Sequence, residues 1–400
     1  MQLKQKENVL KYKLVYTGLI FLVYILGKSI PLYGIDLSVY GNQSADAEKI
    51  LMQMISGDAF RSSVFALGIF PMMISGILVQ LAMSVRNLFS KTRISPKVMG
   101  NLSVIVTMII AVMQTITKIP ELEFAVAEDM LDMARFLAGI EMVTGAMFIV
   151  WLSGRNGKYG VGGRMAFGLV NILERIAAIL LNYPVQRLLL PLVIALVMMQ
   201  ITMILENAEM RIPVQRVSIH NIYADKNYMA IKLNPVGVMP VMFTSAVFML
   251  PQLLISLLAA FFPQHTSVLY WKENMTLTQP IGISIYILCE YLLTIGLSML
   301  TISPKEITDQ FLKSGDSIVN LHAGRDTRRY LRRVVWCISF FSATVMGVCV
   351  VVPLILEMEG NADSTLAMLP ISVMMMSSFW CNISRELISI HKYDSCRLLF

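Results

Sequence analysis

Residues 62–85 read SSVFALGIFPMMISGILVQLAMSV. The stretch has no charged residue, and its 24 residues exceed the roughly 20 that a helix needs to cross a bilayer. Gly68 and Pro71 nevertheless interrupt it, and Gln80 lies near its far end. Lipid offers no hydrogen-bond partner to a broken backbone, so irregular structure at this depth is tolerated only inside protein or beside water. We therefore predict a membrane span whose first turns are shielded from lipid.

The composition of the whole chain agrees with a membrane protein. Of 400 residues, 56% are hydrophobic and 15% are charged, whereas about 25% are charged in typical soluble domains. The apolar residues fall in long uncharged runs. Because every backbone group in hydrocarbon must be satisfied internally, helices are the expected spanning element. The sequence predicts an all-α, polytopic membrane protein.

Ten runs are candidate spans, and their even number with a short turn near Tyr183 favours two pseudo-symmetric halves of five helices, 1–182 and 183–400, as in inverted-repeat transporters. Lys28, at the end of the first run, is expected to extend to the membrane interface. The fifth run is interrupted by Asn171, Glu174 and Arg175. The ten runs are 14–30, 64–85, 102–118, 136–153, 165–181, 187–205, 236–258, 280–302, 334–356 and 364–384.

The charges alternate from loop to loop. Segments 1–13, 86–101, 154–164, 206–235, 303–333 and 385–400 hold 25 Lys and Arg residues, and the alternate loops hold seven. Lys and Arg accumulate on the cytoplasmic side of membrane proteins. We expect both termini to be cytoplasmic, the first apolar run to be a retained span rather than a cleaved signal peptide, and loops 206–235 and 303–333 to carry function.

Motifs for catalysis or cofactor binding are missing. The four histidines are scattered, and there is no HExxH, Walker A or nucleophile-elbow motif. The glycine-rich run 154–163 superficially resembles a phosphate cradle but lacks GK[ST] and a preceding strand, so a cytoplasmic turn is the better interpretation. We expect no enzyme activity, no cofactor and no metal site.

Glu290 lies near the middle of the eighth run. A charge at the bilayer centre costs about 2.5–3.5 kcal/mol on insertion scales, which makes such a residue a functional candidate. A proton relay would need partner acids, histidines or lysines, and no other is evident at mid-span. A hydrogen-bonded or cavity-facing glutamate is the alternative.

A second interrupted span supports a pathway through the molecule. Residues 234–245 read NPVGVMPVMFTS, with the same combination of glycine and proline at a span's start as residues 62–85. Two such spans indicate a pore or transporter with a central pathway. Ordinary proline kinks in a packed bundle remain the alternative.

These residues resemble the SecY family, the channel subunit of the protein-conducting translocon, over nearly the whole chain. Residues 56–71 are similar to the family's plug and second span. Residues 229–240, MAIKLNPVGVMP, resemble its LPLKVNxxGVIP motif. Residues 303–306 with Asp309 and 313–315 are similar to NPRE…D…KKSG, and Gly324, Thr327 and Tyr330 continue that loop's pattern. The resemblance implies an export channel without enzyme activity in a bacterial cytoplasmic membrane.

Two departures narrow the resemblance. The family's GIGNGIS motif reads GVGGRMA at residues 160–166, and the arginine of its IRPG motif is replaced by His322, with Arg325 three residues further on. The cytoplasmic loops and C-terminal tail are also short. Together these features resemble the accessory SecY paralogues of Gram-positive bacteria, which export a few large, serine-rich glycosylated adhesins with their own motor.

By position, the resemblance implies an apolar ring at the waist of an hourglass-shaped channel. An apolar constriction blocks ions by dewetting, and flexible methionines suit a seal around varied side chains. The alternative is that Met is simply abundant, with 30 in the chain. The ring positions are Ile69, Met73, Met165, Leu169, Met239, Met242 and Met368.

The resemblance also implies a plug and a lateral gate. In the family, the second and seventh spans separate sideways to admit a signal peptide, and the candidate polar contacts across that seam are Gln80, Thr244 and Ser245. The plug residues are Gly57, Asp58, Ala59, Phe60, Arg61, Ser62 and Ser63.

The implied partners are a SecA-like motor ATPase, a small SecE-like subunit, the translocating preprotein and membrane lipids, with no nucleic acid. The motor's candidate contacts are basic residues of the two long cytoplasmic loops, most of which could equally be topology determinants. The runner-up function is a secondary transporter of a small solute coupled through Glu290. The motor candidates are Arg211, Lys232, Lys305, His322, Arg325, Arg328 and Arg329.

Overall fold

A computed structural model of the chain describes residues 9–35, 63–89, 95–126, 128–215, 227–245, 247–248, 251, 255, 270–271, 274–277, 279–358 and 364–397. Within these ranges, eight helices are long and apolar enough to cross a membrane. The chain forms two compact units, Met1–Leu190 with Ser364–Phe400, and Pro191–Asp363.

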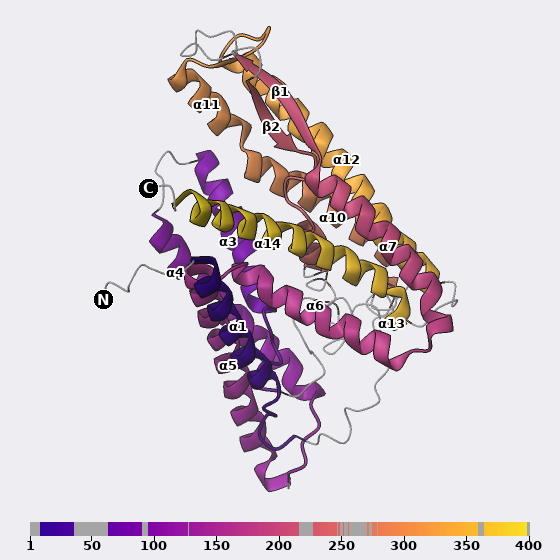
Figure 1. Ribbon diagram of the computed structural model, residues 1–400. Helices are drawn as coiled ribbons and strands as arrows, with labels where there is room; N and C mark the ends of the chain where they lie inside the picture. The colour runs from indigo at the N-terminus through magenta and orange to yellow at the C-terminus, as the bar shows by residue number, and fades with distance from the viewer. Residues whose placement is uncertain are drawn as a thin grey trace. The chain divides into compact units, whose positions relative to one another are not determined.

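The first unit is helical (Figure 1). In it α5 lies beside α1, α4 and α6, and α14 lies along α6 and contacts α1. The first unit therefore contains the tenth predicted span together with the first five. The predicted pseudo-symmetry between halves 1–182 and 183–400 stays a prediction. Its helices are α1 (Val9–Lys28), α3 (Phe70–Phe89), α4 (Pro96–Lys118), α5 (Leu131–Tyr159), α6 (Gly163–Asn182), α13 (Ser364–Ala367) and α14 (Leu369–Arg397), with short 3-10 turns Ile119–Glu121 and Glu128–Met130.

Local sequence sets where several helices begin. The Ser95 hydroxyl caps α4 by accepting from the Val98 amide at 3.4 Å, and Pro96 occupies the first turn, where the missing proline N–H costs nothing. Pro280 and Pro304 begin α10 and α11 in the same way. Proline therefore marks several of the starts of these helices.

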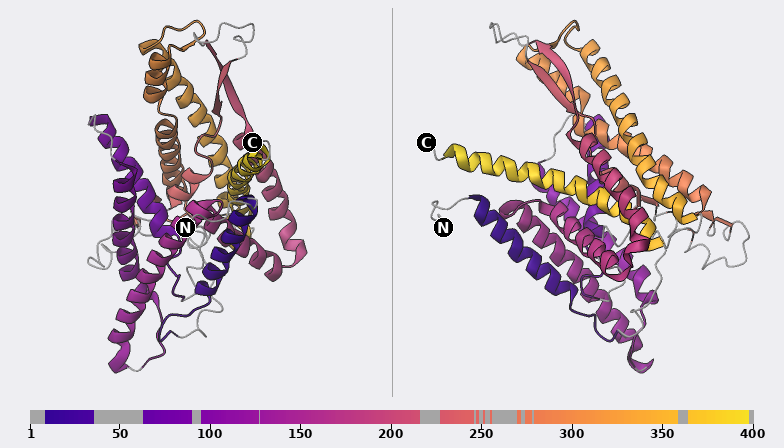
Figure 2. Two further views of the ribbon diagram at one scale, coloured as in Figure 1. Left: turned by 60° about the vertical axis from the view of Figure 1, so that its left-hand side comes forward. Right: turned by 45° about the vertical axis from the view of Figure 1, so that its right-hand side comes forward.

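The second unit combines long helices with a small sheet (Figure 2). α10 (Pro280–Ile302) and α12 (Arg325–Met358) run side by side, and α11 (Pro304–Ser314) contacts α12. α7 (Val185–Asn207) begins in the first unit and continues into the second. The sheet has strand order β2-β1-β3, all antiparallel, formed by β1 (Glu209–Gln215), β2 (Tyr228–Lys232) and β3 (Ser317–Ile318).

The sheet adds to the predicted helical fold a feature that the sequence analysis left out. Loops 206–235 and 303–333, predicted only as long and charged, meet in it. Ile212 and Val214 of β1 are buried and alternate with exposed neighbours, the period-2 pattern of a half-buried strand. Ile212 clusters with Ile318 of β3 and Leu331 of α12, which fixes the sheet on the helix.

The observed helices fall on most of the predicted spans. α3 occupies the second predicted run, although its first turn begins only at Phe70. The seventh run, 236–258, is described only in part, with helix at 239–245. α12 extends nine residues beyond the predicted 334–356 on its N-terminal side, because the charged segment 325–333 continues the helix.

Candidate functional site: interrupted spans and a basic platform

The second span is interrupted where the sequence analysis placed the break. Residues 64–69 form turns in place of a helix, and Gly68 has a φ of +53°, a conformation that glycine adopts without steric cost. The Ala66 amide donates to the Ser63 carbonyl and the Gly68 amide to the Phe65 carbonyl. Lys118 of α4 donates to the Ala66 carbonyl at 3.0 Å. Protein groups thus supply the partners that lipid cannot.

This non-helical segment runs between α1 and α5. A Cβ built on Gly27 of α1 would lie 2.0 Å from the Phe65 ring, and one built on Gly145 of α5 would lie 2.0 Å from the Val64 carbonyl oxygen. Both distances are far below any real contact: a side chain at Gly145 would meet backbone, and one at Gly27 would require the Phe65 ring to shift. The Val64 amide also donates to the Ile30 carbonyl at 3.0 Å. The segment is therefore enclosed on both sides by protein.

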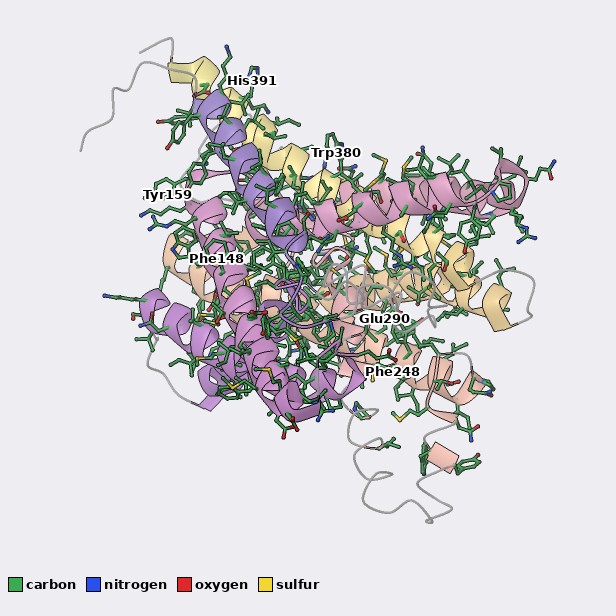
Figure 3. The ribbon with its side chains drawn as sticks, turned by 90° about the horizontal axis from the view of Figure 1, so that it is seen from below. Phe148, Tyr159, Phe248, Glu290, Trp380 and His391 are labelled. Carbon is green, nitrogen blue, oxygen red and sulfur yellow. The ribbon has the colours of Figure 1, made fainter. Side chains whose placement is uncertain are left out.

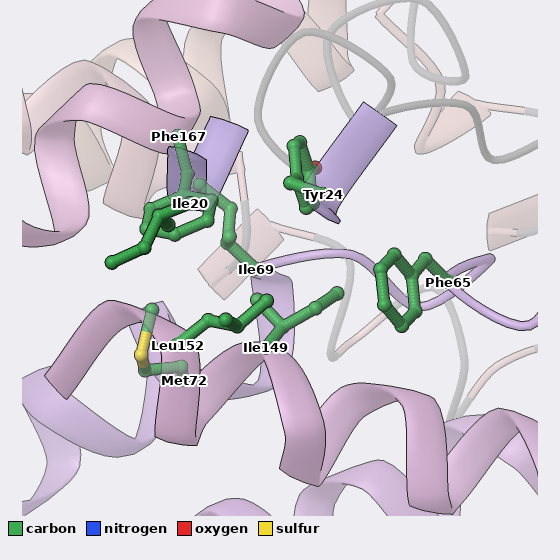
Figure 4. Packing of buried hydrophobic residues seen from close by; sticks show 8 residues of the cluster. All are labelled: Ile20, Tyr24, Phe65, Ile69, Met72, Ile149, Leu152 and Phe167. Carbon is green, nitrogen blue, oxygen red and sulfur yellow. The ribbon is translucent and has the colours of Figure 1, made fainter. Parts of the chain in front are cut away.

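The non-helical segment 64–69 contributes Phe65 and Ile69 to a buried apolar cluster (Figure 4). Tyr24 contacts Phe65 in a stacked arrangement and Phe167 edge-on, with ring centroids 5.9 and 5.1 Å apart. Ile69, directly before α3, and Met72, in its first turn, complete the cluster. The first helical turn after the break is thus held by α1, α5 and α6. The cluster contains Ile20, Tyr24, Phe65, Ile69, Met72, Ile149, Leu152 and Phe167.

The seventh span begins after a similar interruption. β2 ends at Lys232, and the chain turns through Gly237, whose φ is +71°. The side-chain oxygen of Asn234 accepts from the Gly237 amide at 3.0 Å, an Asx-type turn. Helix follows at 239–245. In both spans, therefore, the break precedes the helix.

The predicted ring residues are divided between the two units. Ile69, Met73, Met165, Leu169 and Met368 belong to the first, and Met239 and Met242 to the second. In the first unit, a Cβ built on Gly168 would lie 3.7 Å from Ile69 Cδ1, which places Ile69 beside the α6 stretch that carries Met165 and Leu169. Met73 packs against the same cluster as Ile69. The ring itself remains a prediction.

The other predicted channel elements are described in part. Of the plug, only Ser63 lies within the described residues, and its backbone bridges to Pro31. Thr244 and Ser245 are buried, and their hydroxyls donate to the Pro240 and Val241 carbonyls. The side chain of Gln80 lies outside the described part of the structure. Plug and gate therefore stay predictions.

The Lys28 side chain is buried against α6, and its position relative to the membrane interface stays a prediction. Its side chain is 6% exposed and pairs with Glu174 of α6. Its ammonium also donates to Asn171 at 3.3 Å, and the Tyr24 hydroxyl donates to the same Asn171 oxygen at 2.9 Å. Two of the three polar residues that interrupt the fifth run, Asn171 and Glu174, are thus partners of α1.

A second buried polar network closes the glycine-rich turn between α5 and α6. Asn156 is fully buried and donates to the Val161 and Gly163 carbonyls, at 3.0 Å each. Thr17 of α1 donates to the Asn156 oxygen at 3.0 Å and accepts from the Val161 amide at 2.9 Å. The Val161 amide and the Val161 and Gly163 carbonyls are thus hydrogen-bonded within the protein, which supports the interpretation of this run as a turn rather than a phosphate cradle.

On the other side of this turn, the last helix is attached. The Gly162 amide donates to Glu386 of α14 at 2.9 Å, and the Leu10 amide donates to Asp394 of α14 at 3.0 Å. Sequence analysis missed both contacts, because they join residues more than 100 positions apart. The isolated Asn156 and Glu386 carried no local signal.

One end of the second unit forms a basic platform, defined by the sheet, α11 and the start of α12 (Figures 1 and 2). The Thr327 hydroxyl donates to the His322 carbonyl at 2.8 Å, which ties the start of α12 to the loop before it, and Gly324 in that loop has a φ of +114°. Arg211 lies over the Tyr228 ring at 4.8 Å. Six of the seven predicted motor residues are exposed, and Lys232 is half-buried.

Glu290 is fully buried in the second unit, and within the described residues neither carboxyl oxygen has a hydrogen-bond partner. The described part of the chain also contains no group of three or more His, Cys, Asp or Glu suited to a metal ion.

The geometry defines a class of protein: a multi-span helical membrane protein in which two spans begin with a non-helical segment, and in which a small sheet and two helices form a basic platform. The SecY family model matches residues 63–378. This chain belongs to the SecY family.

Relatives and solved structures agree with that assignment. The accessory Sec system protein translocase subunit SecY2 of Streptococcus agalactiae (strain NEM316) is 29% identical over 90% of this chain and 88% of its own length. The SecY2 of Leuconostoc gelidum is 26% identical over 97% and 96%.

Among solved structures, one described as "The structure of a protein conducting channel" matches with a TM-score of 0.69 and 15% identity, over 98% of this chain and 95% of that one. Sec61 in the canine ribosome-channel complex matches with a TM-score of 0.61 and 17% identity, over 98% and 95%. These structures share the fold of this chain.

Proposed function

We propose that this chain is the central channel subunit of an accessory protein translocase, which exports a few serine-rich glycosylated adhesins across the cytoplasmic membrane. The observation that carries the proposal is the family match over 63–378, which includes both interrupted spans and the basic platform. The names of the SecY2 relatives support the accessory assignment.

The channel works through a dry constriction. Ile69, Met73, Met165, Leu169, Met239, Met242 and Met368 line the waist, and their apolar side chains keep water and ions out until a polypeptide enters. Because Met side chains are flexible and polarizable, they close around residues of different size. The segment 57–63 plugs the resting channel, and the enclosed turns at 64–69 separate it from α3.

A SecA-like motor drives the polypeptide. It docks on the platform, where Arg211, Lys305 and Arg328 are exposed, and a small SecE-like subunit completes the complex. Both termini are cytoplasmic, since the platform and both ends lie on the Lys- and Arg-rich side. The chain itself performs no chemistry.

Site-specific crosslinking tests the constriction. A photo-crosslinking amino acid replaces Met73 or Met242 of the channel protein. A precursor whose folded C-terminal domain stalls its export is then trapped in membranes that contain this variant. Adducts with the precursor are expected at both positions. The matched controls are Met113 of α4 and Met133 of α5, each 63% exposed, where lipid adducts are expected.

Equal precursor adducts at all four positions, or none at Met73 and Met242 with a trapped precursor, would overturn the channel. A pH-gradient-driven flux of a small solute into proteoliposomes, abolished by Glu290→Gln, would favour the transporter instead.

A further inference from the structure

A polar stripe runs along the buried face of α10. Tyr286, Glu290, Thr294 and Ser298 follow one another at four-residue spacing, which aligns side chains on one face of a helix. All four are at most 2% exposed. The rest of α10 is strongly apolar, so this stripe is the exception in the helix and calls for a physical role.

Most of the stripe is unsatisfied within the described residues. Both carboxyl oxygens of Glu290 and the hydroxyls of Thr294 and Ser298 have no hydrogen-bond partner there, and neither does Ser342 of α12. A Cβ built on Gly347 of α12 would lie 3.6 Å from Glu290 Oε2. The carboxyl group therefore lies against α12, at a position without a side chain.

Charged groups that could balance an ionised Glu290 are missing from the elements described against it. α12 carries no charged side chain between Val334 and Leu356, and residues 239–245 carry no titratable one. Among the described residues, the titratable groups that interact electrostatically with the carboxyl group are Tyr286 and Cys349, and both are neutral when protonated. Burial of an ionised carboxylate without a partner is far more costly than burial of the neutral acid.

We propose that Glu290 is a buried proton-binding site: its carboxyl group is neutral while α10 and α12 are packed together, and it releases the proton when water enters between them. The ligand is a proton, and the reaction is ionisation of a carboxylic acid to a carboxylate. Figure 3 labels Glu290 and Phe248.

The stripe also connects this site to the seventh span. The Tyr286 hydroxyl donates to the Val241 carbonyl at 3.2 Å and lies 3.3 Å from the Ser245 hydroxyl, and its ring contacts Phe248 edge-on. Because Tyr286 and Glu290 lie on the same face of α10, movement of residues 239–245 would be transmitted to the surroundings of Glu290 through the Tyr286 contacts. If the proposed channel function holds, opening of the seventh span hydrates the site and releases the proton.

Infrared spectroscopy tests the site directly. The full-length protein is reconstituted in phosphatidylcholine nanodiscs at neutral pH, as wild type, Glu290→Gln and Glu306→Gln. Glutamine has the shape of the neutral acid, so the fold is retained, and Glu306 is an exposed acid of α11. The carbonyl band of a protonated carboxylic acid is expected in the wild type and Glu306→Gln, and its loss is expected in Glu290→Gln. Identical spectra for all three would overturn the proposal.

Thermal unfolding gives a second readout. The folded chain keeps a proton that the unfolded chain releases once pH exceeds the range in which an exposed glutamate titrates. Stability of the wild type relative to Glu290→Gln should therefore fall as pH rises. A Tm difference that is constant with pH would overturn the proposal. Neither readout involves translocation, so failure here leaves the crosslinking test of the channel intact.

Discussion

The carbonyl oxygen of Val64 faces the α-carbon of Gly145 so closely that a Cβ there would lie 2.0 Å from the oxygen. This approach lets the non-helical start of the second span pass along α5. Two features accommodate the interrupted backbone inside the protein. The neighbouring helix α5 has a glycine where the segment passes, and the Lys118 ammonium donates to the Ala66 carbonyl of the segment.

Gly145→Ala is expected to destabilise the protein by about 1–3 kcal/mol or more, because the added methyl group meets backbone that cannot rotate away. Gly154→Ala on the same helix is the control. No heavy atom lies within 4 Å of a Cβ there, and alanine favours helix by up to about 1 kcal/mol. Thermal unfolding in detergent measures both. Equal Tm values for the two variants would contradict the close approach.

Asn156→Asp is expected to destabilise the turn between α5 and α6, because a carboxylate cannot donate to the Val161 and Gly163 carbonyls. Each buried group left without a partner costs about 1–3 kcal/mol. The matched change Gln310→Glu on the exposed face of α11 should leave the Tm nearly unchanged. If Asn156→Asp behaves like Gln310→Glu in thermal unfolding, the network contributes nothing to stability.

The Lys28–Glu174 pair should show energetic coupling in a double-mutant cycle. Removing one partner of a buried pair costs about 3–5 kcal/mol, but Glu174 is 40% exposed, so a smaller loss is expected. Lys28→Met should destabilise the protein, and Lys28→Met with Glu174→Met should recover part of the loss. Strict additivity of the Tm shifts would show that the two residues do not interact.

Gln80→Leu is expected to alter the stringency of signal-sequence recognition. The proposed contacts of Gln80 with Thr244 or Ser245 hold the gate closed, and an interhelical hydrogen bond in lipid averages only about 0.6 kcal/mol, so the change should be about threefold. Export of a reporter with a defective signal sequence measures it, with Gln200→Leu on exposed α7 as control. Unchanged export would argue against the gate contact.

Arg328→Glu with Arg329→Glu should abolish stimulation of the motor's ATPase, because both residues are exposed on the platform and charge reversal repels an acidic docking surface. The control is Arg135→Glu, near the start of α5 and 45% exposed. Normal stimulation of the motor's ATPase activity by the double variant in proteoliposomes would show that the motor docks elsewhere.

Much of this protein follows from its sequence. The apolar runs predicted the helices long enough to span a membrane, because this depends on local composition. The breaks at Gly68 and Asn234 were predictable because each depends on the local backbone or side-chain geometry of one residue. The motifs around residues 56–71, 229–240 and 303–315 indicated the family before any fold was described.

Only the tertiary structure decided which distant residues satisfy the polar groups of the membrane interior. Lys28, Asn156 and Glu386 find partners more than 100 positions away, and Glu290 finds none among the described residues. The hydropathy of each run determines which segments enter the membrane, since the free energy of transfer into lipid is a local and additive sum over residues. Partner choice there depends on packing between helices, which no local pattern encodes.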